Sequence, residues 1–595
     1  MTFTTRPELI GTHGMVSTTH WIATAVGQAV LEAGGNAFDA ATASGFCLQV
    51  VEPHQNGPGG DLPVLFARPG DVTPTVLCAQ GPAPMAATAA AFADLGFDLV
   101  PGSGLLAAVV PGATAGWLTL LRDHGTMGLR DVLGYSIGYA RAGYPVVPAM
   151  SACIEGVADL FRNHWTTSAA TYLPGGHPPA PGTLFRNEAL ARTYEQLVHS
   201  AEASDSREAG IDAAITAWSE GFVAAQVDTF MRSSWLDASG EPHAGLLTGS
   251  DLARWRPWYE QPLGLGFRGH TVYKPGAWSQ GPVLLQQLAL LDGFDLDPGT
   301  ADTVHLVVEC AKLAFADREA WYGDTTDAPL AALLSADYAT MRRRLVGDAA
   351  SYDLRPGSPD GREPRLPRLV TAPPAVRLTD AAAGEPNAAT TDDSRPDAAA
   401  RTDTVHVDVV DRWGTMVSAM PSGGWLQSSP VIPELGFGLG TRLQMTWLEQ
   451  GLASSLTPGR RPRTTLSPTM VMRGDQPVLA FGSPGGDQQD QWQLGLVLEH
   501  LVAGHDLQRS IDAPAFHTAS FPSSFYPRES EPGVVVVEDR LGADVVAALE
   551  ARGHRVRRTG GWSLGRLCAV RRDTSRGTLH AAANPRGMQA YAAGR

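Results

Sequence analysis

The sharpest change in hydrophobic pattern along the chain lies just before residue 405. From there apolar and polar positions alternate: one face carries Val405, Val407 and Val409, and the other carries His406, Asp408 and Val410. A period of two predicts a β-strand. The preceding residues, 373–402, are mostly Ala, Asp, Pro, Thr and Gly, and such a segment buries too little apolar surface to offset the entropy cost of ordering. We therefore expect a mobile linker that ends at a strand, with Thr404 at the junction.

Thr404 at this junction admits two interpretations. Threonine is common in strands, so a Thr at the beginning of one needs no special chemistry. Alternatively, a cut before Thr404 would create a residue that carries both a hydroxyl nucleophile and an α-amine able to act as its base. The local pattern alone leaves both interpretations open.

Helical periodicity dominates the chain before the linker. The spacing of Ile22, Val26 and Val30 predicts a helix that ends at Gly34–Gly35, and a second helix follows directly. Next comes the glycine-rich loop VEPHQNGPGGD, Val51–Asp61, which leads into an apolar strand. The loop lacks the Lys-Ser/Thr pair of a phosphate-binding loop and precedes a strand, so we interpret it as a tight buried turn.

Two further helices are predicted in this part. Residues 109–121 fit a turn followed by a helix, and residues 303–324 fit a long helix whose apolar face carries Leu306, Cys310, Leu313 and Trp321. The opposite face carries Lys312 and Glu319. Asp317 and Arg318 fall on the apolar side, where we expect them to form structural ion pairs.

The chain after the linker is rich in strand signals. Apolar segments flank the turn sequences DRWG, RGD and DTSRG, which predicts three antiparallel hairpins. A helix-rich first part and a strand-rich second part predict an α/β (α+β) fold in which helices cover sheets.

Composition excludes several classes of function. The formal charge is −16 and no long basic run occurs, so neither nucleic acid nor an anionic membrane surface is expected as a partner. No apolar run approaches the length of a membrane span, and the first residues lack the apolar core of a secretory signal. The five cysteines lie far apart without CxxC spacing, which argues against disulfides and zinc and favours a cytoplasmic location. No cofactor or metal is expected, and His54 and His406 are interpreted as hydrogen-bonded structural residues.

One motif suggests a different nucleophile. Gly561–Gly565 matches G-x-S-x-G, the nucleophile elbow of α/β-hydrolases. That elbow requires a strand before it and a helix after it, with an acid and a His downstream. Here the flanks fit antiparallel strands and the chain ends soon afterwards. We therefore expect Ser563 to be a strand residue near the wall of the site.

A series of motifs in order along the chain carries a family resemblance. The motifs are GMVSTTHWIATAVGQAVLEAGGNAFDAATA, VEPHQNGPGGD, VVPGATAGW, HLVVECAKLAFADREAWYGD, DTVHVDVVDRWGTMVSA, RTTLSPTM, FGSPGGDQQ, DAPAFH and AAANPRGMQAYAAGR. On these motifs the chain resembles the γ-glutamyltransferases (glutathione hydrolases), which are N-terminal-nucleophile hydrolases. The resemblance implies an αββα sandwich of antiparallel sheets. It also implies self-cleavage between Asp403 and Thr404 into a large subunit, 1–403, which ends in the linker 373–403, and a small one, 404–595. The two subunits would form one structural unit as a heterodimer, with a dimer of these left open.

The resemblance also assigns catalytic roles. Thr404 matches the nucleophile, and Ser422 matches a hydroxyl that bonds to it. Gly485 and Gly486 match the pair whose N–H groups form the oxyanion hole, where a Cβ would obstruct the substrate. Thr464 and Thr465 match hydroxyls that hold the substrate carboxylate.

Three departures concern recognition of a free amino-acid head group. Gln80 stands where the family has an Arg for the α-carboxylate. Gly424 replaces an Asn, and Trp447 replaces an Asp that binds the α-amine, whereas Gln444 is kept. A buried charge without its partner costs several kcal/mol, so we expect the amide chemistry without the γ-glutamyl specificity.

The residues around these departures suggest the substrate. Trp425, Gln427 and Trp447 would form an aromatic pocket with few charges, open because the segment 445–464 is shorter than the family's lid. Such a pocket suits a small or uncharged amide, as in the branch that includes oxamate amidohydrolase and the acylases. Arg442 and Arg463 are candidate cations for a carboxylate, with surface charge as the alternative, favoured for Arg463. A true γ-glutamyltransferase and a catalytically silent ligand-binding relative remain alternatives.

Overall fold

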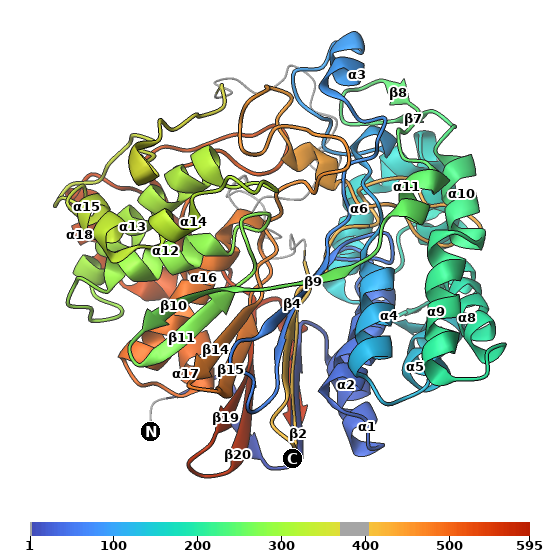
Figure 1. Cartoon of the computed structure of the whole chain (residues 1–595), viewed down its shortest axis with the longest axis horizontal. Coiled ribbons are helices and arrows are strands. Elements are labelled where there is room, and N and C mark those ends of the chain that lie inside the picture. The colour runs from blue at the N-terminus through green and yellow to red at the C-terminus, as the bar shows by residue number, and fades with distance from the viewer. Residues whose placement is uncertain (1–2, 369–403) are drawn as a thin grey trace.

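Two antiparallel sheets, packed face to face, form the centre of the molecule in the computed structural model, which describes residues 3–368 and 404–595 (Figure 1). The first sheet has the strand order β1 (Leu9–Gly11), β20 (Thr578–Ala583), β19 (Cys568–Asp573), β15 (Gln476–Gly482), β14 (Thr469–Arg473), β11 (His270–Lys274) and β10 (Leu263–Phe267). The second has the order β21 (Tyr591–Gly594), β2 (Gly14–Thr18), β12 (Val407–Asp411), β13 (Met416–Ala419), β3 (Leu62–Ala67), β4 (Thr75–Ala79) and β9 (Trp258–Glu260).

Helices cover the outer face of each sheet, which completes an αββα sandwich and confirms the predicted fold (Figure 1). The second sheet is covered by α1 (Trp21–Glu32), α2 (Ala37–Val51) and α4 (Ala113–His124), with α5 (Leu129–Ala142), α8 (Glu188–Glu202) and α9 (Arg207–Ser219) packed further out. The first sheet is covered by α12 (Pro282–Leu291), α13 (Ala301–Trp321), α16 (Gln489–Val497) and α17 (Leu507–Asp512).

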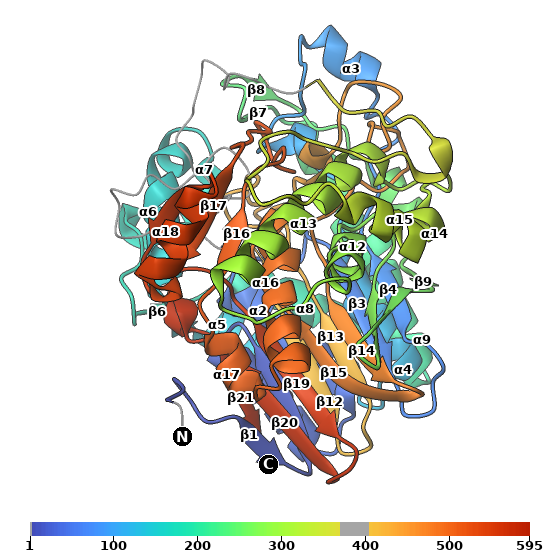
Figure 2. The same ribbon diagram turned by 90° about the vertical axis from the view of Figure 1, so that its left-hand side faces the viewer.

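Smaller elements lie around this sandwich (Figure 2). The remaining helices are α3 (Ala89–Asp94), α6 (Pro148–Asn163), α7 (Thr166–Tyr172), α10 (Phe222–Phe230), α11 (Gly249–Arg254), α14 (Leu330–Leu333), α15 (Ala336–Arg343) and α18 (Ala543–Ala551). A third sheet joins β16 (Phe516–Thr518), β17 (Val534–Glu538) and β18 (Arg555–Thr559), and two short hairpins join β5 (Tyr144–Pro145) to β6 (Leu184–Phe185) and β7 (Trp235–Leu236) to β8 (Pro242–His243). Within the described ranges no helix is both long and apolar enough to span a bilayer.

The parts before and after the linker are interleaved in both sheets. β12 and β13 lie in the middle of the second sheet, where they pair with β2 and β3 from the first part of the chain. In the first sheet β14 pairs with β11. The three predicted hairpins are confirmed as β12–β13, β14–β15 and β19–β20. Since each sheet mixes strands from both parts, the two parts build one structural unit.

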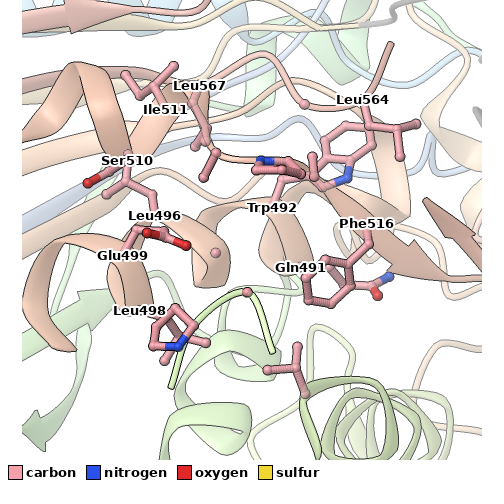
Figure 3. Close-up of a pocket in the computed structure, with 18 of the residues that line it drawn as sticks. Gln491, Trp492, Leu496, Leu498, Glu499, Ser510, Ile511, Phe516, Leu564 and Leu567 are labelled. Carbon is pink, nitrogen blue, oxygen red and sulfur yellow. The ribbon is translucent and has the colours of Figure 1, made fainter. Parts of the chain in front are cut away.

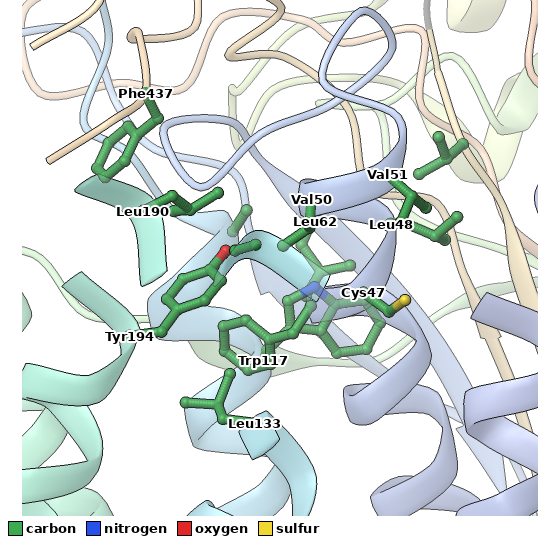
Figure 4. Packing of buried hydrophobic residues seen from close by; sticks show 14 of the residues in the cluster. Cys47, Leu48, Val50, Val51, Leu62, Trp117, Leu133, Leu190, Tyr194 and Phe437 are labelled. Atoms are coloured by element: carbon green, nitrogen blue, oxygen red, sulfur yellow. The ribbon is translucent and has the colours of Figure 1, made fainter. Parts of the chain in front are cut away.

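The alternation that predicted β12 also sets where its side chains are buried. Val405, Val407 and Val409 belong to the large apolar cluster beneath the helices, whereas Val410 belongs to the cluster between the sheets. The large cluster is tightly packed around Trp117 (Figure 4). A Cβ at Gly45 of α2 would lie only 2.2 Å from the Trp117 ring, so glycine there lets α2 approach α4 closely.

The long helix α13 differs from the prediction in its burial. Its extent is close to the predicted 303–324, but Lys312 and Glu319, assigned to a polar face, are buried. The reason is that α13 packs against α12, α18 and β16 and has no wide solvent face. Asp317 and Arg318 do form the expected ion pairs, with Arg342 and Asp487.

Candidate active site

Thr404 lies fully buried just before β12, opposite Ser422. The two residues form an isolated antiparallel bridge, and their hydroxyl oxygens are 3.0 Å apart. On the neighbouring strand, Thr19 N–H donates to the carbonyl of His406. This pairing fixes the beginning of β12 from both sides. Asp403, the other half of the predicted cleavage bond, and the linker 373–403 lie outside the described residues.

The glycine-rich loop holds Ser422 from its other side. Asp61 and Ser422 exchange backbone hydrogen bonds of 2.8 and 3.1 Å. A Cβ at Gly60 would lie 2.0 Å from the Ser422 carbonyl oxygen, and one at Gly59 would lie 2.2 Å from the Gly438 oxygen. The loop is therefore a tight buried turn, as predicted, and its glycines are needed for this backbone contact.

Asp61 also binds a buried cation. Nε of Arg442, in the short helix η6 (Arg442–Met445), donates to both carboxylate oxygens of Asp61, at 2.9 and 3.2 Å. The guanidinium lies 5.0 Å above the ring of Trp425. Burial raises the pKa of Asp61, whereas Arg442 and the amide of Gln80 oppose that rise. Arg442 is thus a buried, paired cation, and the surface alternative considered for it is wrong.

Gly485 and Gly486 form a strained turn between β15 and α16. Their φ angles are +135° and +53°, conformations that favour glycine. A Cβ at Gly485 would lie 2.1 Å from the Trp492 ring. Asp487, the next residue, accepts hydrogen bonds from the Arg318 guanidinium and from Ser524, whose N–H is 2.8 Å away. The turn is therefore held from α13 and from the loop around Ser524.

Thr464 and Thr465 lie in a buried segment beside Ser279. The backbone of Thr464 bonds to Trp278 and Gln280, each at 2.8 Å, and its hydroxyl accepts from Leu466 N–H. The buried Thr465 hydroxyl has no hydrogen-bond partner among the described residues. The Thr465 hydroxyl is therefore available to a ligand as donor and acceptor, and the Thr464 hydroxyl can still donate.

The remaining predicted pocket residues hold neighbouring segments together. Trp425 Nε1–H donates to the Gln55 carbonyl at 2.9 Å and Gln427 donates to that of His54 at 3.2 Å, which ties them to the glycine-rich loop. Gln444 donates to the Gly102 carbonyl and accepts from Tyr526 N–H.

Two expectations about this pocket are wrong. It does not have few charges, because Arg442 lies over Trp425 and Arg528 lies 4.4 Å from the Trp447 ring centre. It is also not open, because Thr404 has 0% and Trp447 only 3% of its surface exposed. The segment after η6 folds back on itself, with Leu456 N–H bonded to the Trp447 carbonyl.

Comparison with known proteins identifies the family. The model of the gamma-glutamyltranspeptidase family matches residues 23–594. The chain belongs to the γ-glutamyltranspeptidase family. Its relatives include the acylase ACY 1 proenzyme of Pseudomonas sp. (strain SE83), 30% identical over 92% of this chain and 88% of the relative. They also include the glutathione hydrolase proenzyme of Bacillus subtilis (strain 168), with 27% identity over 97% and 90%, and the oxamate amidohydrolase proenzyme of Klebsiella pneumoniae, with 28% over 98% and 99%.

Solved structures give the same fold over the whole length. The structure of LmbA2991HD superposes with a TM-score of 0.94 at 54% identity and covers 100% of both chains. A cephalosporin acylase from Bacillus halodurans superposes with a TM-score of 0.82 at 27% identity, covering 100% of this chain and 97% of the acylase. The resemblance to γ-glutamyltransferases is thereby confirmed, and the chain is an enzyme of this family of hydrolases and acylases.

Sequence reasoning on this γ-glutamyltranspeptidase relative missed three site residues. Asp61 is the last residue of the glycine-rich motif, which the sequence indicated only as a tight turn before a strand. Asp487 follows the double glycine directly, but its pairing with Arg318 is a long-range contact. Arg528 lies in a segment without a recognisable motif. Arg463, favoured as a surface charge, is buried and pairs with Glu319 at 3.0 Å, which corrects that expectation.

The histidines near the site behave differently from each other. His406 Nε2 lies 2.8 Å from Asp408 in the layer between the sheets, which confirms its structural role. Both ring nitrogens of the buried His54 lack a hydrogen-bond partner among the described residues, so the expected bonding is wrong there. Burial lowers the pKa of His54 to about 3 and raises that of Glu52, at the beginning of the same loop, to about 8.

Ser563 lies in the irregular segment between β18 and β19 and not in a strand. Its hydroxyl bonds to Thr559 Oγ1 at 2.6 Å and to the Gly560 carbonyl. The preceding strand, β18, pairs in parallel with β17, which corrects the antiparallel flank expected from the sequence. No His or acid is bonded to Ser563 among the described residues, so nothing there activates it as a nucleophile.

One group of side chains outside the site has the composition of a metal site. His305, Glu309 and His554 offer ligand atoms within 4.8 Å of one another. However, the carboxylate of Glu309 already binds Lys312 at 2.6 Å and Arg355 at 3.3 Å. Two cations at the carboxylate oppose binding of a third, so we assign this group to the support of α13.

Proposed function

We propose that the chain cuts itself before Thr404 and then hydrolyses an amide through an ester on the Thr404 hydroxyl. The observation that carries this proposal is the 3.0 Å contact of the Thr404 and Ser422 hydroxyls at the buried beginning of β12. If Thr404 were only an ordinary residue at the beginning of a strand, neither its complete burial nor a second hydroxyl beside its own would be required. Membership of the γ-glutamyltranspeptidase family supports the same proposal.

In the processing step, Thr404 Oγ attacks the carbonyl carbon of Asp403. The C–N bond breaks, the nitrogen of Thr404 becomes a free amine, and an ester links Asp403 to Oγ. Water then hydrolyses the ester, which leaves a carboxylate on 403 and an N-terminal Thr404. The proton that Oγ loses ends on the nitrogen that leaves, and the Ser422 hydroxyl donates a hydrogen bond to Oγ while Oγ carries negative charge. The fragments 1–403 and 404–595 stay together as a heterodimer, since β12 and β13 remain paired with β2 and β3.

In the catalytic step, the α-amine of Thr404 takes the proton from its own hydroxyl, which attacks the substrate carbonyl. The N–H groups of Gly485 and Gly486 stabilise the negative oxygen, a contribution of roughly 10²–10³ in rate for one such donor in other enzymes. The leaving amine departs with a proton, and water cleaves the acyl-Thr404 ester. The clamp of Arg318 on Asp487 keeps the glycine turn in place.

The substrate we propose is an amide with a small acyl group. Thr404 is fully buried, and the predicted pocket residues Trp425 and Trp447 are buried as well. True γ-glutamyl transfer is the second candidate, favoured by the family match and by the glutathione hydrolase relative. Trp447 in place of the family's Asp argues against it, because an ammonium group would lack an acid there.

The test is to trap the acyl-enzyme. Purified protein is mixed with acyl p-nitroanilides, γ-glutamyl-p-nitroanilide and oxamate, and digested protein is searched by mass spectrometry for an acyl group on the Thr404 peptide. We expect a burst of p-nitroaniline with acylation at Thr404. Ser563→Ala is the matched control and retains both. Acylation at Ser563, or processed protein that binds an anilide without any turnover, would contradict the proposal and favour the nucleophile-elbow or ligand-binding alternative.

A further inference from the structure

A cavity of about 70 Å³ lies between α13, α16 and α17, and Thr404 is not among the residues that line it (Figure 3). Its wall is mostly apolar and includes side chains from three helices and from β16, among them Val304, Leu496, Ile511 and Phe516. One buried water needs about 10–15 Å³ of such space, so the cavity has room for a molecule of about five to seven non-hydrogen atoms.

Two features of helix α16 form part of the wall. Gly495 leaves the space open, because a Cβ there would meet no atom within 4 Å, although glycine inside a helix costs stability. The helix then continues as a π turn, η8 (Leu498–Val502), and its residues Leu498 and Glu499 also line the cavity. Single π turns are rare and occur frequently at functional sites. The wall therefore departs from regular, close-packed helix where the cavity lies.

The mouth of the cavity lies between the beginning of α13 and the π turn. Gly299 is exposed and Glu499 is half-buried, whereas Val304 and Leu496 are buried deeper in the wall. A carboxylate oxygen of Glu499 lies 2.8 Å from Nδ1 of His505. A carboxylate at the mouth repels anions, and an apolar interior disfavours any charged group. The cavity therefore suits an uncharged molecule.

Trp492 places a hydrogen-bond donor at this wall. Only 6% of its surface is exposed, and its buried Nε1 has no hydrogen-bond partner in residues 3–368 and 404–595. Other polar side chains at the wall already have partners. Gln491 bonds to the backbone of Thr518. Arg586 pairs with Glu538. Because a buried N–H without a partner is destabilising, an acceptor on a ligand would satisfy the indole.

The same indole ring connects the cavity to the glycine turn. A Cβ at Gly485 would lie 2.1 Å from Cζ3 of Trp492 and 3.0 Å from Cε3. This edge of the ring therefore faces the turn, and Nε1 lies on the opposite edge of the indole. Since the ring is rigid, a hydrogen bond that fixes Nε1 also fixes the edge beside Gly485.

We infer that the cavity binds a small uncharged molecule with an apolar body and one hydrogen-bond acceptor, such as a cyclic ketone. The acceptor binds Nε1–H of Trp492, and the fixed ring restrains the turn at Gly485 and Gly486. A ligand shifts a protein only toward the state that it binds better, and here that state has the ring against the turn. The site is separate from the proposed reaction at Thr404 and does not depend on it.

The binding experiment uses cyclohexanone and methylenecyclohexane, in which a CH₂ group replaces the oxygen. Each is titrated calorimetrically into the intact wild-type protein and into Gly495→Leu. We expect saturable binding of cyclohexanone to wild type and affinity at least tenfold lower in Gly495→Leu, because the added side chain would occupy the cavity. No saturable binding to wild type, or equal affinity in Gly495→Leu, would overturn the inference.

Gly138→Leu is the matched control. Gly138 also lies inside a helix, α5, and a Cβ there would also meet no atom within 4 Å. It is exposed, however, and does not line the cavity. Cyclohexanone should bind to Gly138→Leu as it does to wild type, with the melting temperature of each variant as the check on folding. An equal loss of affinity in both folded variants would contradict binding in the cavity.

Trp492→Phe tests the hydrogen bond. Removal of the indole enlarges the cavity for both probes, so the ratio of their dissociation constants isolates the contribution of the acceptor. We expect the preference for cyclohexanone over methylenecyclohexane to fall at least fivefold in Trp492→Phe. An unchanged ratio would exclude Nε1 of Trp492 as the donor and overturn that part of the inference.

Amide hydrogen exchange measures the link to the turn without any catalytic activity. Exchange reports local opening, so we expect saturating cyclohexanone to slow exchange at Gly485 and Gly486 at least twofold in wild type and not in Gly495→Leu. Unchanged exchange in wild type would overturn the link. If exchange slows as expected but no amide is hydrolysed, the mechanism at Thr404 fails while this site stands.

Discussion

The hydroxyls of Thr404 and Ser422 face each other at 3.0 Å across an antiparallel bridge, at the buried beginning of β12. Ser422 is positioned from its other side by Asp61, so the glycine-rich loop from the first part of the chain orients a residue beside the proposed nucleophile. The pair is thus built from segments that lie far apart in the sequence.

Ser422→Ala removes the hydroxyl that lies 3.0 Å from the Thr404 hydroxyl. We expect self-cleavage and amide hydrolysis to slow by about tenfold, since a lost hydrogen bond of roughly 1.5 kcal/mol corresponds to that factor. The fraction of cleaved chain, followed on denaturing gels during expression and after purification, measures the effect. Ser422→Thr keeps the hydroxyl and should cleave faster than Ser422→Ala; equal rates for the two variants would rule out a role for the hydroxyl.

Gly485→Ala tests the glycine turn. The added Cβ would meet the Trp492 ring at 2.1 Å, in a backbone with φ = +135°. We expect a loss of about 10² or more in kcat/KM, because the N–H groups of the turn would be displaced.

Gly495→Leu, on the helix α16 that follows the turn, is the control. A Cβ at Gly495 meets no atom within 4 Å, and Gly495 lines a cavity of about 70 Å³ beside Trp492, Leu496 and Phe516 (Figure 3). This variant should keep kcat/KM and gain stability, since it fills apolar space and replaces a helical glycine. If Gly485→Ala were as active as Gly495→Leu, the turn would not be part of the catalytic machinery.

The pair of Asp61 and Arg442 should dominate stability near the site. Asp61→Asn removes the carboxylate that Nε of the buried Arg442 binds, which should lower the free energy of unfolding by about 3–5 kcal/mol. The double variant Asp61→Leu/Arg442→Met removes both charges and should recover most of that loss without recovering activity. Urea denaturation of the three proteins measures this. A double variant less stable than Asp61→Asn would contradict the explanation.

Glu52 should make stability depend on pH. Burial raises the pKa of Glu52 from an ordinary value of 4.5 to about 8, with Thr19 and Arg566 opposing the rise. The folded state therefore holds this proton more tightly than the unfolded state, so its contribution to stability is present at low pH and is lost as pH rises from about 4.5 through 8. In Glu52→Gln the decline over this range should be smaller than in wild type. Parallel curves from urea titrations at pH 5 to 8 would contradict the raised pKa.

The sequence predicts those parts of the fold that depend on local pattern. The alternation from Val405 to Val410 correctly placed each side chain on its face of β12, and the turn sequences correctly identified three hairpins. Burial of charged residues was not predictable in this way. Lys and Arg usually lie at the surface. Lys312 and Arg463 are buried here because they form ion pairs with Glu309 and Glu319, and the pair of Arg463 with Glu319 joins segments far apart in the sequence.

The candidate site was predictable where the family resemblance marks it. Thr404, Ser422 and the two glycines came from motifs. In the structure Thr404 and Ser422 are buried and both glycines have positive φ angles, while their catalytic roles stay predictions. The pocket was predicted poorly, because Trp425 and Trp447 were judged by their own chemistry and not by the arginines that stack on them. Nothing local in the sequence pairs Arg528 with Trp447. The cytoplasmic location and the dimer of heterodimers stay predictions.

The most direct test of the account is the intact mass of the purified wild-type chain beside Thr404→Ala. We predict two wild-type fragments, 1–403 and 404–595, with Thr as the N-terminal residue of the smaller one, and a single uncut chain for Thr404→Ala. A well-folded wild-type chain that stays whole, or a Thr404→Ala variant that is still cut at the same bond, would contradict the claim that Thr404 is the nucleophile.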